Sequence, residues 1–178
     1  MKTEIIAKEL ASRMRIRSCT TIVMHATAGS TVGSALVTLA KRGLSYHYLI
    51  AQRNESFEFQ GRNFRLEAGS VVKCVRTSRV AFHCGVSTGP HGPFVNSYSI
   101  GIAFANMNDG VDPYSEAEWA SARELVLQLK TAIPSIRFIT SHRQISYPRK
   151  TDPMGFNVAN LAGLTGLNYF FRNHVPEI

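Results

Sequence analysis

Two runs of β-branched and apolar residues, each leading to a histidine, constrain the fold of this chain most strongly. Residues 20–24 lead into His25, and residues 136–140 end just before His142. Runs of this length and composition predict buried strands. Helical patterns lie between them, at residues 31–43 and 115–134, and Ser115 with Glu118 forms a capping-box signature at the start of the second. The sequence therefore predicts an α/β domain with a central mixed β-sheet flanked by helices.

The remaining segments fill in this plan. Helical spacing of apolar residues predicts an amphipathic N-terminal extension over residues 1–17. The polar stretch 52–67 predicts a loop or an edge hairpin, and we interpret it as a variable insertion. Further strands are expected at residues 46–50, 70–75, 80–84 and 98–107, a surface loop at 87–93, a last helix at 156–164 and an apolar tail at 167–171.

Size and charge limit the classes of protein to consider. The chain has 178 residues, of which 44% are apolar, which suits one domain spanning residues 1–178. It carries 20 Lys and Arg against 12 Asp and Glu, a net charge of +8, so its surface attracts polyanions such as nucleic acid, anionic lipid or the bacterial envelope. Because the basic residues are scattered from Lys8 to Arg172, we expect no nucleic-acid partner.

The sequence also predicts where the protein is made. Its 3 cysteines lack CxxC spacing, which disfavours a disulfide framework and favours synthesis in a reducing compartment. Residues 1–17 are interrupted by charges and do not form a signal peptide. No apolar run approaches the roughly 20 residues of a membrane span, so we expect no membrane insertion. We expect a monomer, because no long heptad pattern is present.

Two histidines and one carboxylate suggest a metal site. Both His25 and His142 follow strands, where open α/β sheets bind their ligands, and Asp152 follows His142 by ten residues. Catalytic zinc takes three protein ligands and keeps a fourth position open, whereas structural zinc is closed, often by cysteines. A single histidine is more often a packed or surface residue than a ligand, but the joint pattern predicts one zinc ion held by His25, His142 and Asp152.

Other polar residues fall near this predicted site. The ammonium group of Lys150, two residues before Asp152, could stabilise the oxyanion that forms when water attacks an amide carbonyl; alone, it would be a solvated surface lysine. In the strand at 46–50, Tyr46 and His47 point to opposite faces, and we expect Tyr46 to face the metal. His83, at another strand end, could contact substrate or simply pack.

Five segments, in order, resemble the zinc-dependent N-acetylmuramoyl-L-alanine amidases of the amidase-2 family, which share a fold with peptidoglycan recognition proteins and bacteriophage T7-type lysozymes. The segments are residues 22–28 around His25, 45–50 around Tyr46, 80–85 around His83, 96–102 from Asn96 through Ser99-Ile100-Gly101-Ile102, and 141–153 from His142 to Pro153. The resemblance implies zinc ligands His25, His142 and Asp152, catalytic roles for Tyr46 and Lys150, and substrate contacts by His83 and Asn96.

The resemblance further implies hydrolysis of the amide between N-acetylmuramic acid and L-alanine in peptidoglycan, at zinc in a surface groove. The chain departs from the family in two places. Ala103 stands where many members have a glutamate thought to be the general base, so Tyr46 or the zinc-activated water would carry more of the catalysis. Residues 52–67 stand where a short hairpin with an Asp-Gly turn is usual.

We interpret the chain as a phage endolysin for host lysis, made in the host bacterial cytoplasm and released to the cell wall. Three alternatives remain open: a cytosolic muropeptide-recycling amidase, a non-catalytic peptidoglycan-binding protein, and a nucleic-acid- or polymerase-binding role for the basic surface.

Overall fold

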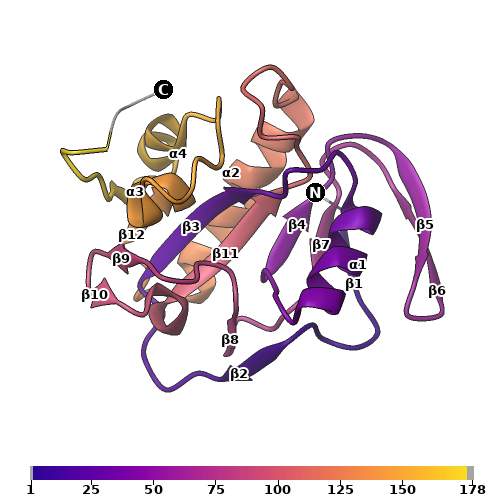
Figure 1. Cartoon of the computed structure of the whole chain (residues 1–178), viewed down its shortest axis with the longest axis horizontal. Helices are drawn as coiled ribbons and strands as arrows, with labels where there is room; N and C mark the ends of the chain where they lie inside the picture. Colours follow the sequence, from indigo (N-terminus) through magenta and orange to yellow (C-terminus); the bar gives the residue numbers. More distant parts are fainter. Residues whose placement is uncertain (1, 176–178) are drawn as a thin grey trace.

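A seven-stranded mixed sheet forms the centre of the computed structural model, which describes residues 2–175 (Figure 1). From one edge to the other, its strands are β1 (Thr3–Ile5), β7 (Val71–Lys73), β4 (Tyr48–Ile50), β11 (Ser99–Phe104), β3 (Thr21–Ala26), β12 (Phe138–Ser141) and β13 (Asn168–Tyr169). The five strands from β4 to β13 are mutually parallel, β1 is parallel to β7, and β7 is antiparallel to β4. The predicted mixed sheet is confirmed.

Helices cover both faces of this sheet. On one face, α1 (Val32–Arg42) packs through Leu36 against a buried cluster that includes Leu49 of β4. On the other face, α2 (Glu116–Ala132) and α4 (Val158–Thr165) pack against Ile22 of β3 and Ile102 of β11. The short helix α3 (His142–Ser146) follows β12 directly. The predicted helix ends are confirmed, since Thr31 and Gly43 cap α1 and Ser115 with Glu118 forms the capping box of α2.

Smaller elements surround the sheet. The strand β2 (Ser12–Met14) pairs with β8 (Arg79–Ala81), and β9 (Thr88–Gly89) pairs with β10 (Gly92–Pro93) before the 3-10 helix η1 (Val95–Tyr98). The strand expected at 46–50 begins at Tyr48, although His47 already bonds toward both neighbouring strands: its N–H donates to the Gly101 carbonyl and its carbonyl accepts from the Cys74 N–H. Within residues 2–175, no helix combines the length and apolarity required to cross a membrane.

The predicted helical extension over residues 1–17 is wrong, because this segment is extended and forms β1 and β2. Ile6 and Leu10 are buried, as their helical spacing suggested, but Ile5 and Met14 are 58% and 75% exposed. The backbone N–H groups of Ile6 and Leu10 donate to the carbonyls of Lys73 and Cys74, respectively. The backbone of this segment therefore forms its hydrogen bonds along the edge of the sheet. The spacing of Ile6 and Leu10, four residues apart, is compatible with a helix but also with this extended arrangement, so the sequence pattern could not distinguish the two.

The polar stretch 52–67 forms the hairpin that was one of its two predicted states. Strands β5 (Glu55–Phe59) and β6 (Arg62–Leu66) are joined by Gln60 and Gly61, which both have positive φ. Its Phe57 ring packs on Gly33 of α1, where an added Cβ would lie 2.8 Å from the ring. The Glu55 carboxylate accepts hydrogen bonds from the N–H groups of Val32 and Gly33, so the hairpin caps the N-terminus of α1.

Candidate metal centre and active site

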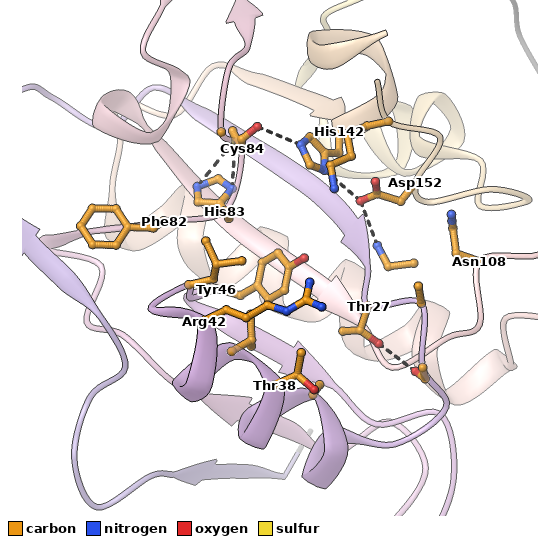
Figure 2. A pocket seen from close by; sticks show the side chains of 18 of the residues that line it. Thr27, Thr38, Arg42, Tyr46, Phe82, His83, Cys84, Asn108, His142 and Asp152 are labelled. Carbon is orange, nitrogen blue, oxygen red and sulfur yellow. Dashed lines mark hydrogen bonds and ion pairs between the residues drawn. The ribbon is translucent and has the colours of Figure 1, made fainter. Parts of the chain in front are cut away.

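Three predicted ligands converge at the carboxyl ends of two neighbouring parallel strands. His25 lies at the end of β3, and His142 is the first residue after β12, which pairs with β3. Asp152 lies in the loop that follows α3, held there by a hydrogen bond from the Arg143 N–H to the Asp152 carbonyl. One carboxylate oxygen, Oδ2, lies 3.3 Å from His25 Nδ1. The same oxygen lies 3.1 Å from His142 Nδ1 (Figure 2).

The arrangement fits a tetrahedral metal. Ligand atoms about 2.0–2.2 Å from a tetrahedral zinc lie roughly 3.3–3.5 Å apart, close to the two observed distances. His25 is fully buried, yet its Nδ1 has no hydrogen-bond partner, which is costly for an imidazole nitrogen unless a cation takes it. His142 Nε2–H can donate to the Cys84 carbonyl at 3.1 Å, which leaves the Nδ1 lone pair facing Asp152.

The protonation states also suit metal binding. Burial, followed by electrostatic interaction with His142, lowers the pKa of His25 to about 4, so the His25 ring is neutral at pH 7. Burial opposes ionisation of Asp152, but the neighbouring His142 and His25 side chains outweigh that effect and hold the pKa of Asp152 well below its usual range. A neutral imidazole and an ionised carboxylate are the forms that coordinate metals.

Tyr46 and Lys150 line the same pocket as the candidate ligands His142 and Asp152, a groove of about 700 Å³, and His25 lies buried behind its wall. The Tyr46 ring centroid lies 4.9 Å from that of His25. Burial and the nearby Asp152 charge raise the pKa of Tyr46 above its ordinary value, so its hydroxyl keeps its proton. As expected, His47 is directed elsewhere: its Nδ1 accepts from the Gly101 N–H and its Nε2 lies 3.1 Å from the Arg79 carbonyl.

The two predicted substrate contacts occupy different positions. His83 lies at the pocket but is only 7% exposed, and its Nδ1 is 2.9 Å from His25 Nε2. Asn96 is not among the residues that line the pocket. Its Oδ1 accepts hydrogen bonds from the backbone N–H groups of His83 and Cys84. The structure therefore gives Asn96 a role in fixing this backbone, which the sequence pattern did not indicate.

Ala103 is adjacent to the metal centre in the sheet. It pairs in register with His25 across β11 and β3, so both side chains point to the same face. Its methyl group is fully buried in the cluster beneath α1. Among the described residues lining the pocket, Asp152 is the one carboxylate.

Asn108, which the sequence did not identify, forms hydrogen bonds with the loop on both sides of Asp152. Its Nδ2 donates to Thr151 Oγ1 at 3.1 Å, and its Oδ1 accepts from the Met154 N–H at 2.7 Å. The sequence around Asn108 is rich in turn residues, which predict a loop but not its long-range partners.

Comparisons with known proteins identify the family and the fold. Residues 15–155 match the Amidase_2 family model, described as N-acetylmuramoyl-L-alanine amidase. No curated protein sequence matches the chain. The chain is similar to the structure of a selenomethionine derivative of AmpD, with a TM-score of 0.68, 22% identity, and coverage of 92% of this chain and 94% of that one.

Two further structures are similar. The Escherichia coli N-acetylmuramyl-L-alanine amidase AmiD, in complex with an anhydro-N-acetylmuramic acid tripeptide substrate, gives a TM-score of 0.65 and 25% identity over 87% of this chain and 61% of that one. The endolysin amidase LysCS from Clostridium intestinale gives 0.66 and 17% over 94% and 97%. Identities below 25% show the fold alone, but the family model matches most of this sequence: the chain belongs to the N-acetylmuramoyl-L-alanine amidase family.

Proposed function

We propose that this protein is a zinc-dependent peptidoglycan amidase that hydrolyses the amide bond between N-acetylmuramic acid and L-alanine. One zinc ion would be held by His25 Nδ1, His142 Nδ1 and Asp152. The observation that carries the proposal is the buried, unpartnered Nδ1 of His25, facing the Asp152 carboxylate beside a second imidazole. When bound, zinc would supply Lewis-acid activation of the amide carbonyl and of water.

Two side chains of the pocket would stabilise the charge that develops on the carbonyl oxygen. Because its pKa is raised, Tyr46 acts as a hydrogen-bond donor to this oxygen and not as a base. The Lys150 ammonium, at the same pocket, adds a positive charge. Neither the Tyr46 hydroxyl nor the Lys150 ammonium has a hydrogen-bond partner among residues 2–175, so both are available to substrate.

Because residue 103 is an alanine, this position provides no carboxylate to act as a general base. A glutamate there would have stood beside His25 and could have accepted a proton from the attacking water. Without it, catalysis depends more on the metal and on stabilisation of the oxyanion by Tyr46 and Lys150. We therefore expect substitutions at these two residues to lower kcat more than they raise KM.

The polymeric cell wall is the substrate we propose, with host lysis as an endolysin as the biological role. A net charge of +8 favours binding to an anionic wall, and the similarity to the endolysin LysCS is consistent with this role. Such an enzyme would meet its substrate after release from the host cytoplasm. A muropeptide-recycling amidase is the alternative favoured by the similarity to AmiD, whose structure holds an anhydro-muropeptide.

The test uses purified protein and isolated sacculi, with and without a chelator. We expect new L-alanine amino termini, their loss with the chelator, and their return with added zinc. Asp152→Asn should abolish both release and stoichiometric zinc binding, because it removes the anionic ligand. Glu58→Gln is the matched control, since Glu58 is an exposed carboxylate on the hairpin. Binding to sacculi without release of amino termini would refute the proposed amidase activity.

A second arm compares substrates. The parent protein is given sacculi and, separately, soluble anhydro-muropeptides, at low and at raised ionic strength. An endolysin should prefer sacculi and should lose that preference as salt screens its charge. A preference for the soluble fragments at every salt concentration would favour the recycling role.

A further inference from the structure

A second set of candidate ligands lies behind His25. The side chains of His25, His83 and Cys84 offer ligand atoms that all lie within 4.8 Å of one another. Two of their distances are hydrogen-bond distances, and we interpret this group as a hydrogen-bonded network. His25 Nε2 and His83 Nδ1 are 2.9 Å apart, and Cys84 Sγ is 3.1 Å from His83 Nδ1. Around a tetrahedral zinc, these pairs would lie about 3.3 Å and about 3.6 Å apart.

The positions of the protons on His83 and His25 can be assigned by starting from Ser99, on the side of His83 away from His25. The Ser99 hydroxyl lies 2.7 Å from the Val95 carbonyl, which can only accept, so Ser99 donates its one proton there. His83 Nε2 lies 3.2 Å from the same Ser99 oxygen and must therefore be its N–H donor. A neutral imidazole carries one N–H, so His83 Nδ1 bears a lone pair and accepts the proton of His25 Nε2.

The assignment fixes which nitrogen of His25 is free. With Nε2 protonated and donating to His83, the lone pair of His25 lies on Nδ1, 3.3 Å from the Asp152 carboxylate. A backbone carbonyl at Val95 thus determines, through Ser99 and His83, the tautomer of a residue at the metal centre. His142 has the same tautomer, with its proton on Nε2 and its lone pair on Nδ1, because Nε2–H donates to the Cys84 carbonyl.

The His83 ring has little freedom to leave this position. Beneath it lies Gly101 of β11, where an added Cβ would fall 2.6 Å from ring atoms Cγ and Nδ1. Asn96 accepts hydrogen bonds from the N–H groups of His83 and Cys84, so the backbone is also held. The ring is packed against His25, with centroids 5.0 Å apart and planes at 84°. Such a clamped, buried ring is suited to orienting its neighbour.

We propose that His83 is a positioning residue, which accepts the Nε2–H of His25 through its own Nδ1 and so keeps His25 Nδ1 free for the metal. This role replaces the substrate contact expected from the sequence. It rests on the proposed zinc site but not on the amidase reaction. Outer partners of this kind typically change metal affinity about 10- to 100-fold when removed.

The test measures zinc affinity by competition with a chromophoric chelator. His83→Phe keeps the ring volume and removes the acceptor, so zinc should bind about 10- to 100-fold more weakly. His83→Asn returns an acceptor oxygen near the position of Nδ1 and should recover most of the loss. His91→Phe is the control, because His91 is an exposed histidine that makes T-shaped ring contacts with Tyr98 and Phe138. Equal zinc affinity in His83→Phe and the parent would overturn the proposal.

A second readout needs neither zinc nor activity. Nitrogen-15 NMR of the metal-free protein distinguishes the two histidine tautomers. His25 should carry its proton on Nε2 in the parent and become a mixture in His83→Phe, or in Ser99→Ala if the Phe variant does not fold. A His25 that stays fully Nε2-protonated in these variants would refute the role of His83. If sacculi are not cleaved but the tautomer changes, the amidase proposal fails and this one stands.

Discussion

The buried carboxyl group of Glu118 should make this protein less stable as the pH rises from 5 to 8. Glu118 is the third residue of α2, and its side chain is 0% exposed. Its Oε2 accepts from the N–H and hydroxyl of Ser115, but Oε1 has no partner. Burial raises the pKa of Glu118 from 4.5 to about 7, although the Ser115 hydrogen bonds act in the opposite direction. In the unfolded chain, this group ionises near its ordinary pKa.

Proton linkage determines how this pKa shift changes the stability of the folded protein. Between pH 4.5 and about 7, folded Glu118 holds a proton that the unfolded chain has lost, so stability falls as pH rises through this window. One pKa unit corresponds to about 1.4 kcal/mol, so the shift from 4.5 to about 7 gives an upper limit of about 3.4 kcal/mol. The effective dielectric constant of proteins, about 20 even at buried sites, reduces the expected effect to about 1–2 kcal/mol. Above pH 7, the loss is complete.

Glu118→Gln tests this directly, because glutamine preserves the capping box but does not ionise. Urea unfolding at pH 5 and pH 8 gives the difference in free energy of unfolding between variant and parent. We expect that difference to shift in favour of the variant by about 1–2 kcal/mol, or about 2–8 °C in Tm, on going to pH 8. Any constant cost of the substitution cancels in this comparison.

Glu116→Gln is the matched control, since it removes an exposed carboxylate from the same helical turn. Its difference from the parent should not change between pH 5 and pH 8. A pH-independent difference for Glu118→Gln as well would show that the carboxyl is ionised normally in the folded protein, and the argument from its burial would be wrong.

Three further predictions concern the pocket and its supports. Tyr46→Phe should lower kcat by about 100-fold with a small effect on KM, because it removes a donor to the oxyanion; an unchanged kcat in steady-state assays would exclude this role. Gly101→Ala should lower the free energy of unfolding by about 1–3 kcal/mol, because the added Cβ would clash with the His83 ring. If urea denaturation gave the same free energy of unfolding for variant and parent, this close packing would be contradicted. Glu55→Ala should cost about 1 kcal/mol by removing the cap of α1, whereas Ser56→Ala, at an exposed position on the same strand, should be neutral in thermal melts.

The sequence predicted those parts of the fold whose signals are local. The β-branched runs before His25 and His142 identified the two central strands, and the parallel pairing of β3 and β12 then brought the histidines together. The capping box of Ser115 and Glu118 identified the start of α2. In each case, the residues that determine the element lie within the element or next to it.

What the sequence did not predict depends on partners far along the chain. The N-terminal segment has helical spacing, but its hydrogen bonds go to β7 and β8, about 70 residues away. The interaction of His83 with His25 spans 58 residues, and that of Asn108 with Thr151 spans 43. Periodicity and turn chemistry carry no information about such contacts, so these supporting roles were found only in three dimensions.

The hydrogen bonds from the N-terminus of α1 to the Glu55 carboxylate of the hairpin have a consequence for engineering and for evolution. The helix contributes Thr38 and Arg42 to the groove wall, whereas no residue of β5 or β6 reaches the groove. Glu55 and Phe57 nevertheless fix where that helix begins. Substitutions in the hairpin can therefore shift one wall of the groove while the opposite wall, with Asp152 and Lys150, stays in place. Substitutions in the hairpin could therefore change the preference for the stem peptide without altering the residues that we propose for catalysis.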